Sequence, residues 1–267
     1  MKAELQRGEF ATALRGWRNH RRVSQLELAL SAGTTQRHIS FLESGRSQPG
    51  RGMALRLAEA LQVPLRDRNA LLLAAGYAPA YRETRFDDPE LDPVRSALER
   101  ILEGHMPCPA VIVDRQGDLV VSNEAFWTLT EGVPPRLREQ PVNVPRLFLD
   151  PDGMAPRIIN LELWCWHVIE AIRREAIRNG NERLTALVEE LESLAPDRPK
   201  AAAPDYLGFA VPLRLRTDRG ELRLMTTLTH FGTAVDVTVA ELKMEAFLPA
   251  DRDSAAILAE LSGRSTA

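Results

Sequence analysis

The most constraining feature of the chain is a run of twenty residues near its N-terminus, from Ser24 to Glu43. Ser24 followed by Glu27 has the spacing of a capping box, which begins a helix. Gly33 stands where a left-handed residue would end that helix, and Thr35 is placed to cap a second one. The pattern therefore predicts two short helices that are joined by a tight glycine turn.

Apolar residues repeat at helical spacing on both sides of this pair of helices. Phe10, Leu14 and Trp17 recur at positions i, i+4 and i+7, which predicts that one face of an earlier helix is buried. Similar patterns follow the pair, and together they predict five short helices in a closed all-α domain. The expected helices lie near residues 9–21, 24–33, 35–43, 53–61 and 67–75, within a domain over residues 1–76.

Charge is distributed unevenly along the 267 residues, although the net charge is only −3. Residues 1–85 carry 14 lysine and arginine residues against 7 aspartate and glutamate residues, whereas residues 86–267 carry 20 against 30. The first part therefore has a net charge of +7 and the second a net charge of −10. A basic N-terminal part suits contact with a polyanion such as DNA.

Polar side chains are expected on the outer face of the third helix. Ile39 and Leu42 would bury its inner side, which leaves Gln36 and Arg37 pointing outward at its N-terminal end. In the major groove of DNA, glutamine can make two hydrogen bonds to adenine and arginine can make two to guanine. The spacing therefore favours a helix that reads base sequence, and the alternative is an ordinary solvated helix face.

This segment resembles the Xre/Cro family of helix-turn-helix proteins, and Thr34-Thr35-Gln36 is similar to lambdoid phage repressors. The resemblance covers about residues 9–76 and implies two kinds of contact with double-stranded DNA. Base contacts are implied for the start of the third helix, whereas phosphate contacts fix the register without reading sequence. The implied base-reading residues are Thr35, Gln36, Arg37 and Phe41, and the implied phosphate contacts are Gln25, Ser40 and Arg46.

A second domain is predicted after a linker at 77–93, which is rich in proline and acidic residues. Residues 94–267 combine a hairpin pattern, long helical segments and three later strands, which indicates an α+β fold. The pattern fits a PAS-like sheet whose helices wrap over one face and enclose a cavity. The expected elements are a helix over 94–103, strands over 110–114 and 118–122, a short helix from 123, helices over 157–194 broken near 180, and strands over 206–216, 221–229 and 235–247.

Several segments of the second domain form a pattern of their own. They are Pro107–Asp114, Val121–Asn123, Asn143, Arg146–Pro151, His230–Thr238 and Glu245–Pro249. On these segments the domain resembles the ligand-binding domain of MmyB-type regulators, which pair it with an Xre-type head. The resemblance implies a PAS-like sensor for a small apolar or fatty-acid-like molecule. Residues 159–167 depart from this resemblance, because they lack the Tyr-x-x-Trp-like sequence expected there.

Residues that would line a ligand pocket are expected on the hairpin, the helices and the last strands. Plain core packing is the alternative for each of them, because apolar residues at helical spacing usually form a core. A carboxylate ligand would need a cation, for which Arg146 and Arg173 are candidates. The predicted lining residues are Val111, Val113, Asn123, Phe126, Trp127, Arg146, Trp164, Cys165, His167, Val168, Leu224, Thr226 and Leu228.

Motifs for catalysis, metal binding or nucleotide cofactors are not found in the sequence. The five histidines are scattered, and the two cysteines, Cys108 and Cys165, are expected to be free thiols in a cytoplasmic protein. No apolar stretch is long enough to span a bilayer. We therefore expect no enzyme activity, cofactor, metal or membrane contact.

The expected function is regulation of transcription by a homodimer. Two heads on a two-fold symmetric operator would sit about 34 Å apart, one turn of DNA. Three alternatives remain open at this point. They are a second domain that serves only in dimerisation or protein docking, a redox or metal switch based on the two cysteines, and an enzyme fused to a DNA anchor.

Overall fold

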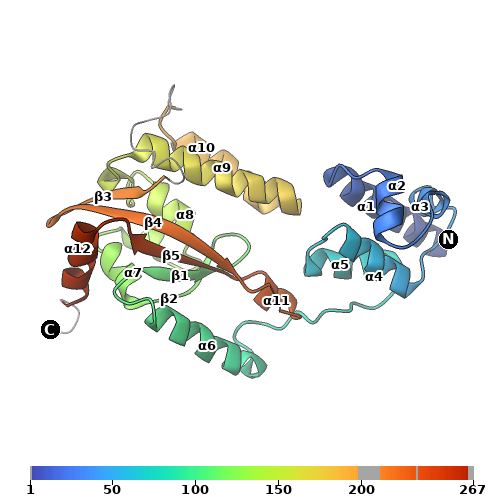
Figure 1. The fold of residues 1–267 in the computed structure, drawn as a ribbon, viewed down its shortest axis with the longest axis horizontal. Helices are drawn as coiled ribbons and strands as arrows, with labels where there is room; N and C mark the ends of the chain where they lie inside the picture. The colour runs from blue at the N-terminus through green and yellow to red at the C-terminus, as the bar shows by residue number, and fades with distance from the viewer. Residues whose placement is uncertain (1, 198–210, 233, 264–267) are drawn as a thin grey trace. The chain divides into compact units, whose positions relative to one another are not determined.

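The chain folds as two compact units (Figure 1). The computed structural model describes residues 2–197, 211–232 and 234–263. The first unit comprises residues 1–85 together with 233–240, and the second comprises residues 86–232 together with 241–267. A short segment from late in the chain therefore belongs to the N-terminal unit.

The first unit contains the five predicted helices, so the all-α head is confirmed. Its core is formed by apolar side chains from all five helices, among them Phe10, Leu28, Ile39, Leu57 and Leu72, each at most 1 % exposed. The helices are α1 (Lys2–His20), α2 (Gln25–Ser31), α3 (Gln36–Glu43), α4 (Arg51–Ala60) and α5 (Leu65–Ala74).

Helix α1 begins at Lys2, seven residues before the predicted start at Glu9. The prediction was wrong here because it relied on an apolar stripe that begins only at Phe10. Residues 2–8 contain no proline, and the single Gly8 lowers helix stability by only about 1 kcal/mol relative to alanine. The helix can therefore extend beyond the part that the core requires.

The predicted linker at 77–93 is more structured than its composition indicates. Asn69 of α5 holds its first residues, because its Oδ1 accepts hydrogen bonds from the backbone N–H of Ala80 and of Tyr81. The segment ends in a short 3₁₀ turn, which helix α6 (Asp92–Glu103) follows directly. This helix begins two residues before its predicted start at Val94. Proline near the first helical position is compatible with helix initiation, which explains the earlier start.

The second unit is built on a five-stranded antiparallel sheet, which confirms the predicted α+β fold. The strand order is β2-β1-β5-β4-β3, so the first hairpin and the later strands form one sheet. The strands are β1 (Ala110–Val113), β2 (Leu119–Ser122), β3 (Leu213–Thr217), β4 (Gly220–His230) and β5 (Lys243–Pro249). Residues 206–210 of the predicted third strand lie outside the described residues.

The strand predicted over Val235–Phe247 is wrong in its first half. Residues Val237–Ala240 form the short helix α11, and β5 begins only at Lys243. The apolar residues of this segment have a strand-like pattern, but Asp236 caps a helix that begins at Val237. The Asp236 Oδ1 accepts a hydrogen bond from the Thr238 N–H at 2.9 Å, which is a typical helix-initiating contact.

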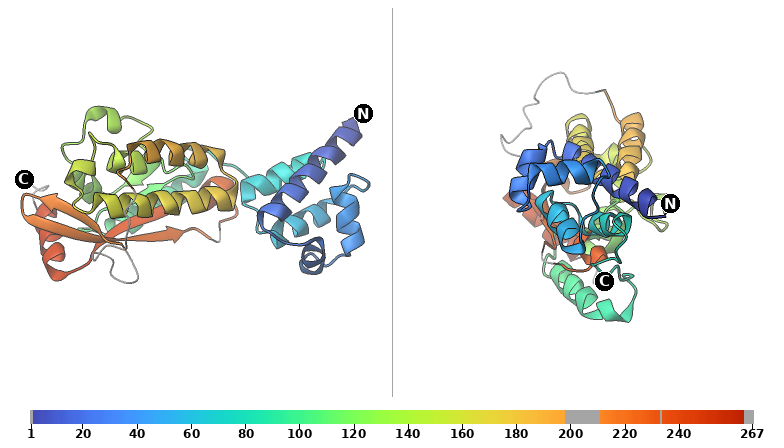
Figure 2. Two further views of the ribbon diagram at one scale, coloured as in Figure 1. Left: turned by 90° about the horizontal axis from the view of Figure 1, so that it is seen from above. Right: turned by 90° about the vertical axis from the view of Figure 1, so that its right-hand side faces the viewer.

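Helices cover both faces of the sheet. Helix α6 packs on one face, where Leu98 and Leu102 meet Ile112 and Met244. On the other face, the core joins apolar residues of the sheet to a larger group of helices, and α9 and α10 lie side by side in Figure 2. The elements of this group are α7 (Glu124–Leu129), α8 (Val144–Leu149), α9 (Leu161–Asn179) and α10 (Glu182–Leu194), and α12 (Arg252–Ser262) packs beside β4.

The predicted break in the long helical region is present. Gly180 adopts φ +60°, a left-handed conformation that suits glycine at the end of a helix. Asn181 then caps α10, because its side chain accepts hydrogen bonds from the N–H groups of Arg183 and Leu184. Among the described residues, no helix combines the length and the apolar character that a membrane span needs.

Candidate DNA interface and ligand cavity

The N-terminal end of α3 presents the polar side chains that the sequence predicts. Thr35 caps the helix by accepting a hydrogen bond from the His38 N–H at 3.2 Å. Ile39 points into the core, whereas Gln36 and Arg37 are exposed. The helix is therefore fixed from inside while its first turn stays accessible.

Phe41 lies half-buried between two arginines on the outer side of α3. The Arg37 guanidinium lies 5.3 Å from the centre of the Phe41 ring, and that of Arg46 lies 6.0 Å from it. Such cation–π contacts orient arginine side chains without neutralising their charge. Ser40 is exposed on the same helix. Phe41 thus serves first as a platform that positions the two arginines.

A buried ionic network, which the sequence pattern did not predict, joins α1, α2 and α3. The Glu43 carboxylate accepts hydrogen bonds from Arg18 Nε at 2.6 Å and Nη2 at 3.0 Å, and from Gln25 Nε2 at 2.8 Å. Arg15 donates to the Glu43 backbone oxygen at 2.8 Å. Glu43 follows the buried Leu42, and this position beside the inner stripe was the only signal in the sequence.

The charge of Glu43 is held in place by its partners. Burial by itself would raise the pKa of this carboxyl, but the hydrogen bonds from Arg18 and Gln25 and the charges of Arg18 and Arg15 lower the pKa below its ordinary value. Gln25, the predicted phosphate contact, is thereby oriented by Glu43. The network fixes the relative positions of the helix that would touch phosphates and the helix that would read bases.

A cavity of about 450 Å³ lies within the second unit. Its walls come from α8, α9, β4 and β5, elements that lie far apart in the sequence (Figure 1). The lining residues include Phe148, Trp164, His167, Val168, Ile172, Arg174, Glu175, Thr226, Leu228, His230, Lys243, Glu245 and Phe247. A cavity of this size fits a small molecule.

The cavity has an aromatic end and a polar end. At the aromatic end the Phe148 ring lies 5.6 Å from Trp164 and stacks on Phe247 at 5.5 Å. At the polar end the Lys243 ammonium of β5 forms an ion pair with Glu175 of α9. Lys243 and Phe247 lie four residues apart on β5, so the ends are separated by about 13 Å. This arrangement suits an elongated molecule with one polar group.

Two titratable groups that line the cavity are shifted away from their charged forms. Burial raises the pKa of the Glu245 carboxyl, the Glu175 charge adds to this, and the Lys243 charge opposes it. Burial and the nearby Arg174 charge lower the pKa of His167. Perturbed titratable groups in a cavity are typical of functional sites.

The structure brings together only part of the predicted pocket. Five of the predicted residues line the cavity, namely Trp164, His167, Val168, Thr226 and Leu228. Four others, Val111, Val113, Phe126 and Leu224, are at most 1 % exposed and belong to the hydrophobic core. Sequence periodicity assigned a face to each strand residue, but it did not show where packing leaves space.

The remaining predicted pocket residues have structural partners. Asn123 caps α7, and its side chain also binds the backbone of Ala110, Leu102 and Cys108. Trp127 packs against Phe126 and lies under the Arg138 guanidinium. The two candidate cations are engaged in ion pairs, Arg146 with Glu190 and Arg173 with Glu170 and Glu192.

Both cysteines are free thiols. Burial raises the pKa of the Cys165 thiol to about 11 and also raises that of Cys108. A protonated thiol is a poor nucleophile and is oxidised slowly. The described residues contain no group of three or more His, Cys, Asp or Glu side chains placed to hold a metal ion.

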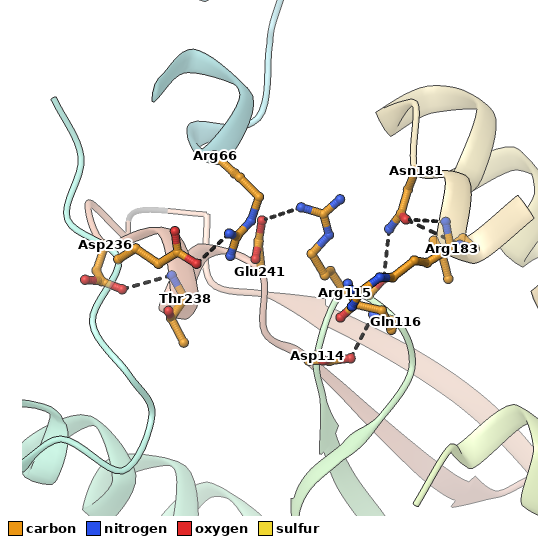
Figure 3. A network of polar contacts seen from close by, with 11 residues as sticks. Arg66, Asp114, Arg115, Gln116, Asn181, Arg183, Asp236, Thr238 and Glu241 are labelled. Carbon is orange, nitrogen blue, oxygen red and sulfur yellow. Dashed lines mark hydrogen bonds and ion pairs between the residues drawn. The ribbon is translucent and has the colours of Figure 1, made fainter. Parts of the chain in front are cut away.

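The connection between β4 and β5 forms part of the first unit. Helix α11 packs against α5, and Asp236 Oδ2 accepts hydrogen bonds from the N–H of Thr84 at 3.1 Å and from its hydroxyl at 2.7 Å. Figure 3 shows Asp236 with Thr238 at the start of α11, and, within the second unit, the ion pair of Glu241 with Arg115. The two strands that line the cavity are thus joined through a segment of the N-terminal unit.

Comparison with protein families agrees with both parts of this description. The family described as MmyB-like transcription regulator ligand binding domain matches residues 94–261, which include the whole cavity. The chain belongs to this family of MmyB-like transcription regulators. A helix-turn-helix family matches residues 14–67, which include α2 and α3. No curated protein matches the chain.

The family gives each unit of this MmyB-like regulator a role. The N-terminal unit is a helix-turn-helix DNA-binding domain, and the second unit is a ligand-binding domain. The protein is therefore a DNA-binding transcription regulator that carries a ligand-binding domain. Both matched families consist of regulator domains and not of enzymes.

Proposed function

We propose that this protein is a sequence-specific regulator that binds a two-fold symmetric operator as a homodimer, and that a small ligand in the cavity modulates its affinity for DNA. The ligand is largely apolar and fatty-acid-like in shape. The protein acts in the cytoplasm of a bacterial-type cell, because the chromosomal DNA that it binds is there. The observation that carries the proposal is the combination of an exposed, internally braced α3 with a cavity in the second unit.

The exposure of the first turn of α3 supports base reading by Thr35, Gln36 and Arg37. Gln36 and Arg37 carry the donor and acceptor groups that distinguish adenine and guanine in the major groove. Phe41 orients Arg37 by a cation–π contact, and the same ring contacts the guanidinium of Arg46. Phe41 is within reach of a thymine methyl when α3 lies in the groove.

Phosphate contacts are assigned to Gln25, Ser40 and Arg46, which lie outside the core of the first unit. These contacts set the register of α3 and add a dependence on salt concentration. Gln25 donates one amide hydrogen to Glu43, so its second amide hydrogen remains for a phosphate oxygen.

The cavity and its connection to α11 support modulation by a ligand. A ligand shifts an equilibrium only by its difference in affinity for two arrangements of the protein. Strands β4 and β5 line the cavity, and the segment between them packs against α5 of the DNA-binding unit. A change in the spacing of these strands would therefore reach the DNA-binding unit through the chain itself.

The test of DNA recognition is selection of bound sequences from a random pool, followed by affinity measurement at fixed salt concentration. Gln36→Ala and Arg37→Ala should each cost about 1–3 kcal/mol on the selected site and relax preference at one base position. Gln25→Ala should weaken binding to all sequences alike. Glu59→Ala, an exposed change on α4, is the control. If the selected sequence is unchanged in both α3 variants, the assignment of α3 is wrong.

The test of modulation uses native mass spectrometry and the same binding assay. Protein purified from cells should carry a small molecule whose removal changes affinity for the selected operator. Sedimentation should show a dimer both free and on the operator. A second domain that never carries a ligand, while the dimer and DNA binding persist, would instead indicate a dimerisation module.

A further inference from the structure

The cavity contains, between its polar and aromatic ends, an acidic side chain with no partner of its own. Glu245 lies at the middle of β5, and its accessible part faces the cavity. It pairs across the sheet with Leu228 on β4 and with Val111 on β1, so apolar side chains flank it on both sides. Within the described part of the chain, its carboxyl group makes no hydrogen bond or ion pair.

The cation nearest to Glu245 along the strand is already neutralised. Lys243 points to the same face of β5, and its ammonium is paired with Glu175 of α9. The interior therefore holds two carboxyl groups and one ammonium group. A carboxylate that lines a cavity without a partner can make a charge-assisted hydrogen bond to a ligand that supplies a donor.

The other basic residues that line the cavity are exposed, namely His167, Arg174, Arg178 and His230. Arg174 and Arg178 of α9 are exposed to water, which screens their charges. Partial desolvation and the Arg174 charge lower the pKa of His167, which favours its neutral form. A carboxylate placed beside Glu245 would thus add a third acidic group at a point where Lys243 is the only cation among the described lining residues that is not exposed.

We propose that the cavity binds an amphipathic amine, whose ammonium group pairs with Glu245 and whose hydrocarbon part packs against Phe148, Trp164 and Phe247. This inference rests on the proposed function and specifies the chemistry of its ligand. The ligand keeps the elongated apolar shape of a fatty acid, but its polar group carries the opposite charge.

The charges balance when such a ligand binds. The ammonium ligand enters with one positive charge and meets the one negative charge of the Glu245 carboxylate, so that an ion pair with no net charge remains. The Lys243–Glu175 pair stays as it is. A neutral alcohol can also bind Glu245 by a hydrogen bond, but it gains no ionic attraction.

Isothermal titration calorimetry of the full-length protein tests this inference with decylamine, decanoate and decanol, which share one hydrocarbon chain and differ in the polar group. Decylamine should bind at least about tenfold more tightly than decanoate. In Glu245→Gln, which keeps the shape of the side chain, decylamine affinity should fall by about tenfold or more, whereas decanol affinity should stay within about twofold. Retained decanol binding also shows that the variant is folded.

Two further proteins complete the experiment. Glu245→Asp should retain the preference for the amine, and Glu189→Gln, which removes an exposed carboxylate outside the cavity, should behave as the wild type. Tighter binding of decanoate, or an unchanged amine affinity in Glu245→Gln, would overturn the amine inference while leaving ligand regulation standing. If no probe binds and none alters operator affinity, the inference and the assignment of the cavity both fail.

Discussion

Replacement of Arg18 by methionine should unfold the DNA-binding unit preferentially. Arg18 donates two hydrogen bonds to the Glu43 carboxylate and a third, from Nη1, to the backbone oxygen of Val23 at 2.9 Å. The side chain of Glu43 is only 1 % exposed and that of Arg18 is 14 % exposed. Methionine preserves the apolar stem of arginine but leaves the carboxylate of Glu43 with Gln25 as its remaining side-chain partner.

The expected cost follows from the burial of this pair. Removal of one partner from a buried ion pair typically costs about 3–5 kcal/mol, because the other charge is left uncompensated. The lower end applies here, since Gln25 still donates to Glu43. A loss of about 3 kcal/mol corresponds to roughly a hundredfold faster hydrogen exchange through opening of the unit.

The dependence on pH gives a second, independent signature. The folded-state pKa of Glu43 lies below its ordinary value, so its contribution is present above the unfolded pKa and is lost as the pH falls through the folded pKa. Without Arg18, burial dominates and the pKa of Glu43 should rise above the ordinary value. The loss of stability of the DNA-binding unit in the variant, relative to the wild type, should then be largest at neutral pH and smaller in acid.

Hydrogen exchange with mass spectrometry on the full chain measures both effects, because it reports α1 to α3 separately from the second unit. Arg51→Met, which changes an exposed arginine on α4, is the matched control. Protection that falls less than about tenfold in Arg18→Met would refute the reasoning. A loss of stability that becomes larger as the pH is lowered would also refute it.

Two other changes test features of the fold. Gly180→Ala should destabilise the α9–α10 pair by about 1–2 kcal/mol, because φ is +60° there, whereas Gly16→Ala within α1 should be neutral or slightly stabilising; equal effects on local hydrogen exchange would contradict this. Asp236→Ala removes both hydrogen bonds to Thr84 and should abolish the effect of ligand on operator affinity while ligand binding persists. Asp253→Ala on α12 is its control, and an unchanged ligand effect in Asp236→Ala would show that α11 carries no coupling.

Local sequence signals predicted those elements whose ends are set by their own residues. The capping box at Ser24 and the glycine after α9 lie where the structure has a helix start and a helix end. The segment before β5 was mistaken for strand, because its apolar residues fit either structure and the decisive contact is the Asp236 carboxylate. The early start of α1 was missed because its first turns need no apolar stripe.

The candidate sites divide in the same way. The sequence placed Gln36 and Arg37 on the outer face of α3, because helical periodicity is a local property. It did not predict the buried Arg18–Glu43 pair, which joins residues 25 positions apart. For the cavity, the sequence pattern predicted the lining residues Trp164, His167 and Val168 on one helix, but it did not predict Lys243 and Glu245.

The sequence by itself determined the two-part architecture, the helix-turn-helix and the α+β character of the second domain. Capping residues, turn glycines and apolar periods specify these features over a few turns of chain. Only the tertiary structure decided where space remains between α9 and the sheet, and which charges face it. Cavities and buried charges depend on which distant segments pack together, as Glu175 and Lys243 do across 68 positions. The polar end of the ligand cavity is therefore a property of the folded chain alone.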